Sequence, residues 1–547
     1  MWIRQWFCVS VMIAVLMTAG SLHANGEDLH CHVAPAHEPS VAEKAYLSGK
    51  AAEAEKLYRE ALAKSPHDAA LTAGLVRSLL REQKVEDASS TISSELALAP
   101  TAVALLTASA EVEYRQGKLA EAAGTADQAF RIDPCNARLY LIRARIFRLN
   151  SMYASERRAI GVAHALDPSD IDIRQTWFGT LPLAQRIDQQ KQFLASANGM
   201  DPEERARSER GLTNLLNQAS NPDQTCHVSS NLTSTELPLV PILSQGNSTR
   251  IQTWGLHVLF NNIATTLGVD TGASGLIINR AIAERAGLKP IARFQMGGVG
   301  DQGPQGAYAA HVDSIRMGSL EFRDCMVQVT DRKDILSMDG LIGTDVFSSY
   351  LVTLDYPMRK FLLSQLPPRP ADSSSADAAL NTEGGSQAAG ASGTSSAQPQ
   401  DRYICPTMKD YSPFFRSGHD IIIPTRLNGK AERLFLVDTG AFSSAISPEV
   451  ARAVTKVHGG DAGSVRGLSG DVAKVSFSEA VLFQFAGIQQ QNNDLYSFDT
   501  SGMSRFAGLE ISGFLGSTVL RQLTISIDYR DGLIKFDYDP RHGNHNF

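Results

Sequence analysis

The stretch Val269-Asp270-Thr271-Gly272-Ala273 recurs later in the chain as Val437-Asp438-Thr439-Gly440-Ala441. Each copy is followed at a similar distance by an apolar-apolar-Gly segment, first Leu341-Ile342-Gly343 and then Phe514-Leu515-Gly516. Two acidic turns of this kind can place two carboxyl groups face to face, where they share one proton and together activate a water molecule. A chain that carries both turns supplies both carboxyl groups by itself.

The residues around the two turns predict a duplicated β unit. An Asn-Gly or Asn-Asn pair separates two apolar runs ahead of each acidic turn, which is a β-hairpin signal. The runs are 421–427 and 434–437 around Asn428-Gly429, and 256–260 and 263–269 around Asn261-Asn262. A short helix is expected after each turn, because Asn279 and the pair Ser447-Pro448 are good helix starts.

The two β units are predicted to span 232–366 (unit 1) and 403–547 (unit 2). The segment between them, 367–402, is rich in Ser, Ala, Gly and Pro and cannot bury enough apolar surface to order itself. A flexible tether of this length reaches roughly 35 Å, and a lobe of this size has a radius of gyration of about 13 Å. The two units can therefore dock face to face.

The first part of the chain shows a different period. Prolines recur with a spacing of 34 residues, at Pro66, Pro100, Pro134, Pro168 and Pro202. Small residues keep the same register, which lets paired helices approach closely, and each proline stops a helix. The segment 36–220 resembles an array of tetratricopeptide repeats, an α-solenoid. Such an array either binds a peptide or partner protein on its concave face or serves as a spacer or dimerisation arm.

The bulk composition excludes some partners and cofactors. The chain has 547 residues and a formal net charge of -7, so there is no electrostatic reason to expect nucleic acid as a partner. Its six cysteines are scattered, without C-x-x-C spacing or zinc-like clustering with histidine. We expect no metal and no other cofactor.

Residues 1–24 read as a signal peptide. Arg4 supplies the positive start, 7–16 is apolar, and small residues near Ala24 offer a cleavage point. The expected location is the periplasm or the medium, with no membrane contact beyond this signal. If Cys8 is removed with it, one remaining thiol must stay free or pair with another chain.

With these motifs in hand, each β unit resembles a retropepsin-type (gag-polyprotein-like) aspartyl protease domain of the bacterial kind. The motifs that carry the resemblance are 270–274 with 340–343, and 438–441 with 513–516. The resemblance implies an α+β multidomain chain, in which an α-solenoid precedes two all-β acid-protease barrels that form a pseudo-dimer.

The family resemblance also implies roles for the residues of the turns. Asp270 and Asp438 would be the catalytic pair, one ionised as general base and the other protonated. Thr271 and Thr439 would hydrogen-bond across the interface. Gly272 and Gly440 would leave room for the backbone to approach the carboxylates.

A flap hairpin that closes over substrate is implied after each turn. Its glycines permit bending, and the candidates are Gly298, Gly300, Gly467 and Gly470. Ser274 is a further candidate for the substrate-side lining, where the second copy has Phe442. The approach to the first turn is polar, with Thr265 and Thr266.

Alanine follows the glycine of both turns, at Ala273 and Ala441, where pepsin-like enzymes have Ser or Thr. A missing hydroxyl donor stabilises the carboxylate less and raises its pKa. We therefore expect a pH optimum in the mildly acidic range.

Three arrangements remain open at this level. The leading hypothesis is an endopeptidase whose carboxyl pair forms within one chain, acting on extended peptides with a bias toward bulky apolar residues. A second arrangement keeps the chemistry but pairs each copy with its twin in another molecule. The third is a non-catalytic peptide-binding or scaffold protein that uses a degenerate protease-like cleft together with the helical array.

Overall fold

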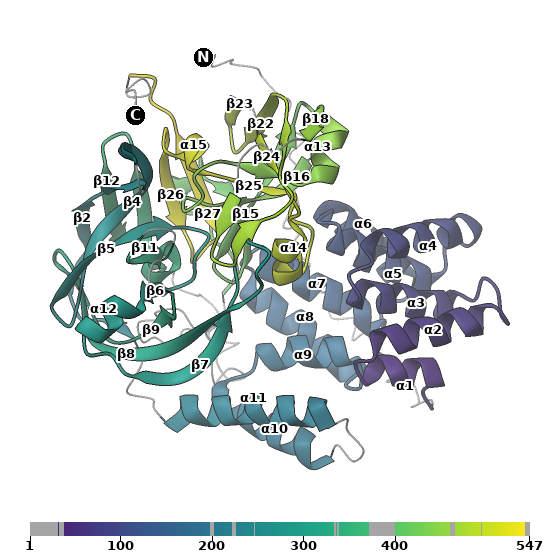
Figure 1. Cartoon of the computed structure of the whole chain (residues 1–547). Helices are drawn as coiled ribbons and strands as arrows, with labels where there is room; N and C mark the ends of the chain where they lie inside the picture. The colour runs from purple at the N-terminus through teal and green to yellow at the C-terminus, as the bar shows by residue number, and fades with distance from the viewer. Residues whose placement is uncertain are drawn as a thin grey trace.

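The structure is a computed structural model of the whole chain (Figure 1). It describes residue 31 and residues 38–196, 202–220, 226–244, 247–332, 335, 338–370, 400–430, 432–459, 465–493 and 495–541. The predicted signal peptide 1–24 and most of the predicted tether 367–402 lie outside these residues.

Antiparallel helix pairs build the first part of the chain, as the 34-residue period predicts. Each even-numbered helix up to α8 ends shortly before one of the periodic prolines, and Ala54, Ala88 and Ala122 are fully buried between helices. The helices are α1 (Val41–Leu47), α2 (Ala51–Leu62), α3 (Ala69–Arg81), α4 (Val85–Leu98), α5 (Val103–Arg115), α6 (Leu119–Ile132), α7 (Ala137–Leu149), α8 (Tyr153–Leu166), α9 (Ile171–Gly179), α10 (Leu183–Ser196) and α11 (Pro202–Ser220). No helix in the described part of the chain is both long and apolar enough to cross a bilayer.

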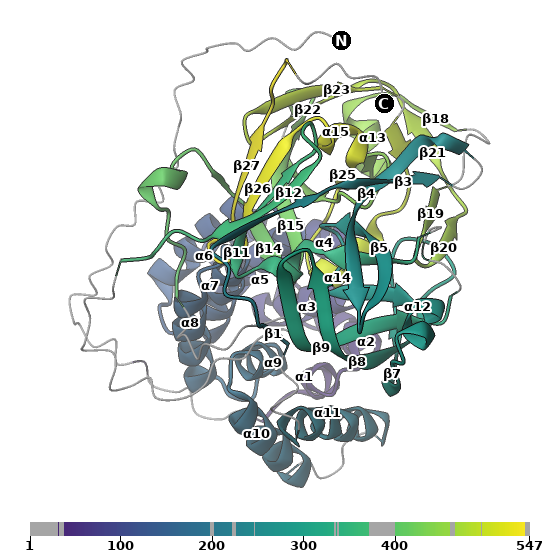
Figure 2. The ribbon, with the colours of Figure 1, turned by 90° about the vertical axis from the view of Figure 1, so that its left-hand side faces the viewer.

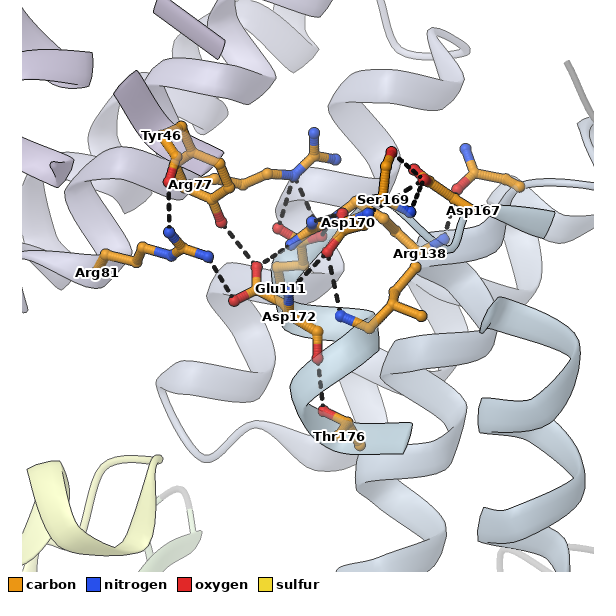
Figure 3. A network of polar contacts seen from close by, with 12 residues as sticks. Tyr46, Arg77, Arg81, Glu111, Arg138, Asp167, Ser169, Asp170, Asp172 and Thr176 are labelled. Atoms are coloured by element: carbon orange, nitrogen blue, oxygen red, sulfur yellow. Dashed lines mark hydrogen bonds and ion pairs between the residues drawn. The ribbon is translucent and has the colours of Figure 1, made fainter. Parts of the chain in front are cut away.

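A buried charge network joins the odd-numbered helices of the array (Figure 3). Arg138 of α7 donates to Glu111 of α5 at 2.6 Å and to Asp172 of α9 at 2.9 Å, and it also pairs with Asp170. Tyr46 of α1 donates to Asp172 at 2.7 Å. The first and the ninth helix are therefore bridged across the face that these helices share.

Unit 1 is a closed β structure with one short helix. Nine of its described strands form one sheet that β8 and β9 close by pairing with each other, and its other three, β2, β11 and β12, belong to a second sheet. The elements are β1 (His227–Val228), β2 (Ser234–Pro238), β3 (Val240–Ser244), β4 (Asn247–Phe260), β5 (Ile263–Asp270), β6 (Leu276–Asn279), α12 (Arg280–Arg285), β7 (Pro290–Met296), β8 (Gln305–Met317), β9 (Leu320–Thr330), β10 (Gly340–Gly343), η1 (Thr344–Phe347), β11 (Tyr350–Asp355) and β12 (Lys360–Gln365).

Unit 2 repeats this order. The predicted turn pair Asn428-Gly429 has positive φ at both residues, and Ser447 caps α13 as expected. The elements are η2 (Pro406–Met408), β13 (Ser412–Pro413), β14 (Phe415–Ser417), β15 (Asp420–Leu427), β16 (Glu432–Val437), β17 (Ala445–Ile446), α13 (Pro448–Val454), β18 (Val457–Gly459), β19 (Val465–Gly467), β20 (Gly470–Val472), β21 (Ser476–Ser478), β22 (Val481–Phe485), β23 (Ile488–Asn492), β24 (Leu495–Ser497), α14 (Ser501–Ala507), β25 (Gly513–Leu515), α15 (Ser517–Leu520), β26 (Thr524–Asp528) and β27 (Leu533–Asp537).

One six-stranded sheet contains strands of both units, in the order β13-β27-β26-β11-β12-β2 (Figure 2). The junction is the antiparallel pair β11–β26, in which Val352 lies opposite Ile527 and Leu354 opposite Ile525. These four side chains are fully buried in one hydrophobic core that both units share. The two units therefore form an intramolecular pseudo-dimer.

The helical array packs directly against unit 2. Strand β16 faces two ways, since Phe435 and Val437 lie in the shared β core whereas Leu434 and Leu436 pack against α5, α6 and α7. The carbonyl of Arg115 accepts from the backbone N–H of Glu510 at 2.8 Å. The strand that leads into Asp438 is thus covered on both faces.

The two described ends of the tether meet at one residue of unit 2. Arg369 and Gln400 hydrogen-bond to each other, and Arg369 pairs with the buried carboxylate of Asp531. Arg402 donates to the Asp531 carbonyl at 2.8 Å, and the N–H of Tyr403 donates to its carboxylate at 2.8 Å. The segment 371–399 therefore starts and ends at the same place, and its reach is not needed to bring the units together.

Two disulfides connect distant parts of the chain. Cys31 pairs with Cys135 at the start of the array's fourth helix pair, and Cys226 pairs with Cys325 of β9. Cys405 is the free thiol among the described cysteines. Its side chain accepts from the hydroxyl of Thr407 at 3.3 Å.

We expect Arg138→Met to destabilise the array strongly. The change removes the cation that Glu111, Asp170 and Asp172 share, although Glu111 keeps Arg77 and Asp172 keeps Arg81. The expected cost is about 3 kcal/mol of unfolding free energy. Arg143→Met on the same helix is the matched control, because the exposed Arg143–Asp127 pair contributes less than about 1 kcal/mol. Urea unfolding of both variants measures the difference, and equal losses would contradict the role given to the network.

Replacing 371–399 by about eight Gly and Ser residues should keep the fold, because its described ends already touch. The shorter loop should raise the unfolding free energy by about 1 kcal/mol through its smaller closure entropy. A longer deletion that also removes Arg369 and Arg402 should lower it, because the buried Asp531 then loses Arg369 from its carboxylate and Arg402 from its carbonyl, and keeps Arg530. Thermal unfolding distinguishes the two variants, and a destabilised short-loop variant would disprove the idea.

Candidate active site

The two acidic turns meet at the junction between the units. Asp270 ends β5, and β5 runs parallel to β10, so that Gly343 lies beside Asp270. In the same way β16 runs parallel to β25, with Leu515 beside Val437. The apolar-apolar-Gly segments found in the sequence are the strands that hold the turns in place.

Reciprocal threonine hydrogen bonds lock the two turns together. The Thr271 N–H donates to Thr439 Oγ1 at 3.0 Å, and the Thr439 N–H donates to Thr271 Oγ1 at 3.0 Å. Each hydroxyl then donates to the carbonyl before the opposite aspartate, Thr271 to Val437 at 2.5 Å and Thr439 to Val269 at 3.1 Å. All four bonds are buried and cross from one unit to the other.

This lock places each carboxyl group against the glycine of the opposite turn. A Cβ at Gly272 would lie 3.0 Å from Asp438 Cγ, and one at Gly440 would overlap the carboxyl group of Asp270. Any side chain at Gly440 would therefore displace Asp270. The structure brings the predicted pair and its four supporting residues into one site.

The environment disfavours ionisation of both carboxyl groups. Burial and the negative charge of Asp438 raise the pKa of Asp270 well above its usual value. Burial also raises the pKa of Asp438, although the N–H groups of Ala441 and Gly440 and the hydrogen bond with Asp270 oppose the rise. Two like charges so close cannot both persist, and the pair holds one proton over a wide pH range.

The loops behind the turns are braced differently in the two units. In unit 1 the carboxylate of Asp345 accepts from the Gly275 N–H at 2.9 Å and from the Ser274 hydroxyl at 3.2 Å. In unit 2 the corresponding segment donates instead, from the Ser517 N–H to the Ala441 carbonyl at 2.7 Å. The hydroxyl of Ser274 thus points to this brace, and its role in lining the substrate site stays a prediction.

The two glycine-rich stretches form hairpin tips that bond to each other. The N–H of Ser469 donates to the Val299 carbonyl at 2.9 Å, and its own carbonyl accepts from the Gln302 N–H at 2.8 Å. The contact is so close that a Cβ at Gly467 would overlap the Val299 carbonyl oxygen. The predicted flap glycines lie at these tips: Gly298, Gly300, Gly467 and Gly470.

The joined tips pack beside the acidic turns. Leu468 and Met296 contact the apolar cluster that contains Ala273. Val299 and Val465 contact the cluster that Ala441 also touches. Both flap hairpins therefore border the small cluster that contains Ala273, and both also border the larger cluster that Ala441 touches.

Two further groups at the site, His419 and Asp420, had no signal in the sequence. The imidazole Nε2 of His419 lies 3.2 Å from the Gly272 carbonyl oxygen and 3.2 Å from Asp420 Oδ1. Burial and the charges of Asp438 and Asp345 raise the pKa of Asp420 to about 6, against the effect of His419. The ring of Phe506, on α14, is 71% exposed and lies 6.1 Å from the imidazole.

Two buried tyrosines from the repeated Asp-Tyr endings of the units hydrogen-bond to threonines at or near the site. Tyr356 hydrogen-bonds to Thr439, and burial raises its pKa above the usual value. Tyr529 hydrogen-bonds to Thr344 at 2.5 Å. No group of three or more potential metal ligands occurs in the described ranges.

Thr271→Val should separate the two turns without changing side-chain volume. The change removes the acceptor of the Thr439 N–H and the donor to the Val437 carbonyl, so two buried backbone groups lose their partners. The expected loss of unfolding free energy is about 2–5 kcal/mol. Thr271→Ser keeps the hydroxyl and should lose far less, and equal losses in urea unfolding would contradict this account.

Comparisons with known proteins agree with the two-part architecture. The family model described as aspartyl protease matches residues 256–346 and 423–519, and the model described as tetratricopeptide repeat matches 45–108. No curated protein matches the chain.

Two solved structures are similar to parts of the chain. One is a thermophilic tetratricopeptide repeat protein of Thermus thermophilus, with 21% identity over 31% of this chain and 95% of that chain, at a TM-score of 0.26. The other is a retropepsin-like aspartic protease from Rickettsia conorii, with 17% identity over 25% of this chain and 92% of that chain, at a TM-score of 0.18. From the family models, this chain carries two tandem units of the aspartyl protease family behind a tetratricopeptide-repeat segment.

Proposed function

We propose that this protein is an aspartic endopeptidase that forms its catalytic pair within one chain. The observation that carries the proposal is the reciprocal threonine lock, which presses Asp270 and Asp438 against each other's turns. The aspartyl protease family assignment of both units supports a hydrolase. A cleft that only binds peptide needs neither the carboxyl pair nor the lock.

The chemistry follows from the single proton that the pair holds. The ionised carboxylate accepts a proton from a bound water, whose oxygen attacks the scissile carbonyl carbon. The protonated carboxyl donates to the carbonyl oxygen, which gives a tetrahedral diol. A hydroxyl of the diol then returns a proton to the carboxyl group that had donated one. The amine nitrogen takes the proton first removed from water, and the C–N bond breaks.

A mildly acidic optimum remains part of the proposal. Burial raises the pKa of both carboxyl groups, so the ionised member requires a higher pH than an ordinary aspartate would. In both turns alanine stands where a hydroxyl donor would hold the pKa down. An activity maximum below about pH 3 would contradict this.

Substrate and partner binding are proposed on different parts of the chain. An extended peptide would lie between the turns and the flap tips, with apolar side chains favoured by the surrounding clusters. Tetratricopeptide repeats suggest a protein partner, and the array also supports unit 2. A partner on the face of α1 to α9 would compete with the contacts of Arg138.

Export to an oxidising compartment is also proposed. The two disulfides support it, because such bonds persist mainly outside the reducing cytosol. Mass spectrometry of the mature protein from its natural host would test removal of residues 1–24.

Asp270→Asn and Asp438→Asn should each reduce kcat/KM for peptide cleavage by roughly 10²–10⁴-fold, since either change removes one partner of the proton exchange. Asp313→Asn is the control, because its carboxylate is exposed on unit 1. A fluorogenic peptide library measures cleavage, and a statine-type inhibitor should block it.

The pattern of losses separates the hypotheses. Activity that survives in Asp438→Asn but not in Asp270→Asn would indicate that first turns pair between molecules. Unchanged cleavage in Asp270→Asn, or none in the wild-type protein under any condition, would remove the enzyme and favour a peptide-binding protein.

A further inference from the structure

His419 lies at the tight turn between β14 and β15 and reaches across to unit 1. Its Nε2 lies 3.2 Å from two acceptors, the Gly272 carbonyl oxygen and Asp420 Oδ1. Both atoms are acceptors, so Nε2 carries a hydrogen that is shared between them. The imidazole is thus fixed in place by one group from each unit.

Gly272 connects this imidazole to the carboxyl pair. Its carbonyl accepts from His419, while its Cα faces Asp438, whose Cγ would lie 3.0 Å from an added Cβ. His419 and Asp438 therefore contact the same glycine. The imidazole opposes the rise in the pKa of Asp438, as expected for a positive charge at this range.

The corresponding positions of unit 1 hold no ionisable group. Two residues before each catalytic aspartate, Leu436 lies opposite Ile422 and Gly268 lies opposite Gly255. Counting back along the paired strands, Asp420 corresponds to Thr253 and His419 to Gln252. Unit 1 thus has an amide and a hydroxyl at the two positions where unit 2 has an imidazole and a carboxyl group.

We propose that His419 breaks the symmetry of the carboxyl pair, so that Asp438 is the ionised base and Asp270 holds the shared proton. This inference rests on the proposed function and assigns the two roles within it. Asp438 takes the proton from water, and Asp270 donates its proton to the carbonyl oxygen. Asp270 then recovers a proton from the diol, and Asp438 passes the water proton to the leaving nitrogen. His419 touches neither water nor peptide in these steps and is a positioning residue.

Charged and titratable groups from several elements surround the pair formed by His419 and Asp420 of β15. Asp438, after β16, interacts with both members of the pair, and Asp345 of η1 and Tyr529 after β26 interact with Asp420. Arg416 of β14 interacts with Tyr529. Asp420 is the carboxylate that pairs with the imidazole directly. Because its pKa is raised to about 6, Asp420 is neutral below that pH and leaves the imidazolium uncompensated. The lowering of the Asp438 pKa by His419 is therefore largest below about pH 6, where Asp420 is neutral.

His419→Gln tests the inference through the pH profile of kcat/KM. Loss of the cation raises the pKa of Asp438, so the acid limb should move up by about one pH unit. His419→Lys keeps a positive charge and should return the limb toward its original position. His458→Gln is the matched control, because His458 pairs with Glu479 on the exposed β18–β21 edge of unit 2. Its limb should not move.

Carboxyl ¹³C titration of aspartate-labelled protein gives a second reading that needs no activity. Signals of Asp270 and Asp438 are assigned from the two asparagine variants, and thermal unfolding confirms that each variant is folded. In His419→Gln the lower titration of the pair should shift up by about one pH unit.

The inference is overturned if His419→Gln titrates like the wild type and His458→Gln. It is also overturned if His419→Lys shifts as far as His419→Gln, because the hydrogen bond and not the charge would then be responsible. A wild-type protein that cleaves nothing removes the proposed function alone, and the ¹³C titration still decides the charge assignment.

Discussion

The reciprocal hydrogen bonds between Thr271 and Thr439 are the constraint from which the rest of the site follows. They leave the two turns one relative position, in which each carboxyl group meets the backbone of the opposite turn. Burying two carboxyl groups together is unfavourable when both are charged, so the arrangement persists only because one proton stays with the pair. The six-stranded sheet shared by both units resists their separation. The shared proton that lets the buried interface persist is thus the same proton that the proposed reaction uses.

Because both units belong to one chain, their sequences can differ. The residues of β16 and β5 differ according to whether the helical array packs against the strand. Strand β16 is apolar on both faces because the helical array packs against it, whereas its counterpart β5 has Thr266 four residues before Asp270, where β16 has Leu434 four residues before Asp438. Thr265 donates to Asp339, and Thr266 hydrogen-bonds to His257. Thr266 therefore matches a strand face that the array does not cover, and Thr265 points to the opposite face. Both hydroxyl groups have partners, so the polar approach to Asp270 does not indicate a degenerate unit.

Local signals in the sequence predicted local structure well. The positive φ values of Asn428 and Gly429 and the helix caps at Asn279 and Ser447 follow from neighbouring residues alone, so they could be read directly. The two acidic turns are recognisable because the motif occurs twice. The second copy indicates which distant residue each aspartate contacts. His419 has no such duplicate. Its partner Gly272 is 147 residues away, and a lone histidine in a polar turn carries no pattern that indicates it. The docking of the array had a weak signal in the uninterrupted apolar run 434–437, which predicts burial on both faces but not by what.

The flap tips of the two units also depend on each other, because they hydrogen-bond to one another beside the turns. Ser469 of one hairpin bonds through its N–H, its carbonyl and its hydroxyl to three residues of the other, Val299, Gln302 and Gly298. The buried Ser469 would lose all three bonds if the hairpins separated, so these bonds couple the two tips. In the proposed endopeptidase, an entering peptide would replace these bonds with its own backbone groups, because an extended strand offers donors and acceptors along its length. The hydrogen bonds that close the free protein therefore favour an extended backbone as the ligand, independently of its side chains. In the proposed endopeptidase, selectivity among sequences would come from the unequal surroundings of the two turns, where unit 1 has Ser274 and Asp345 and unit 2 has Phe442 and Thr518 at the corresponding positions.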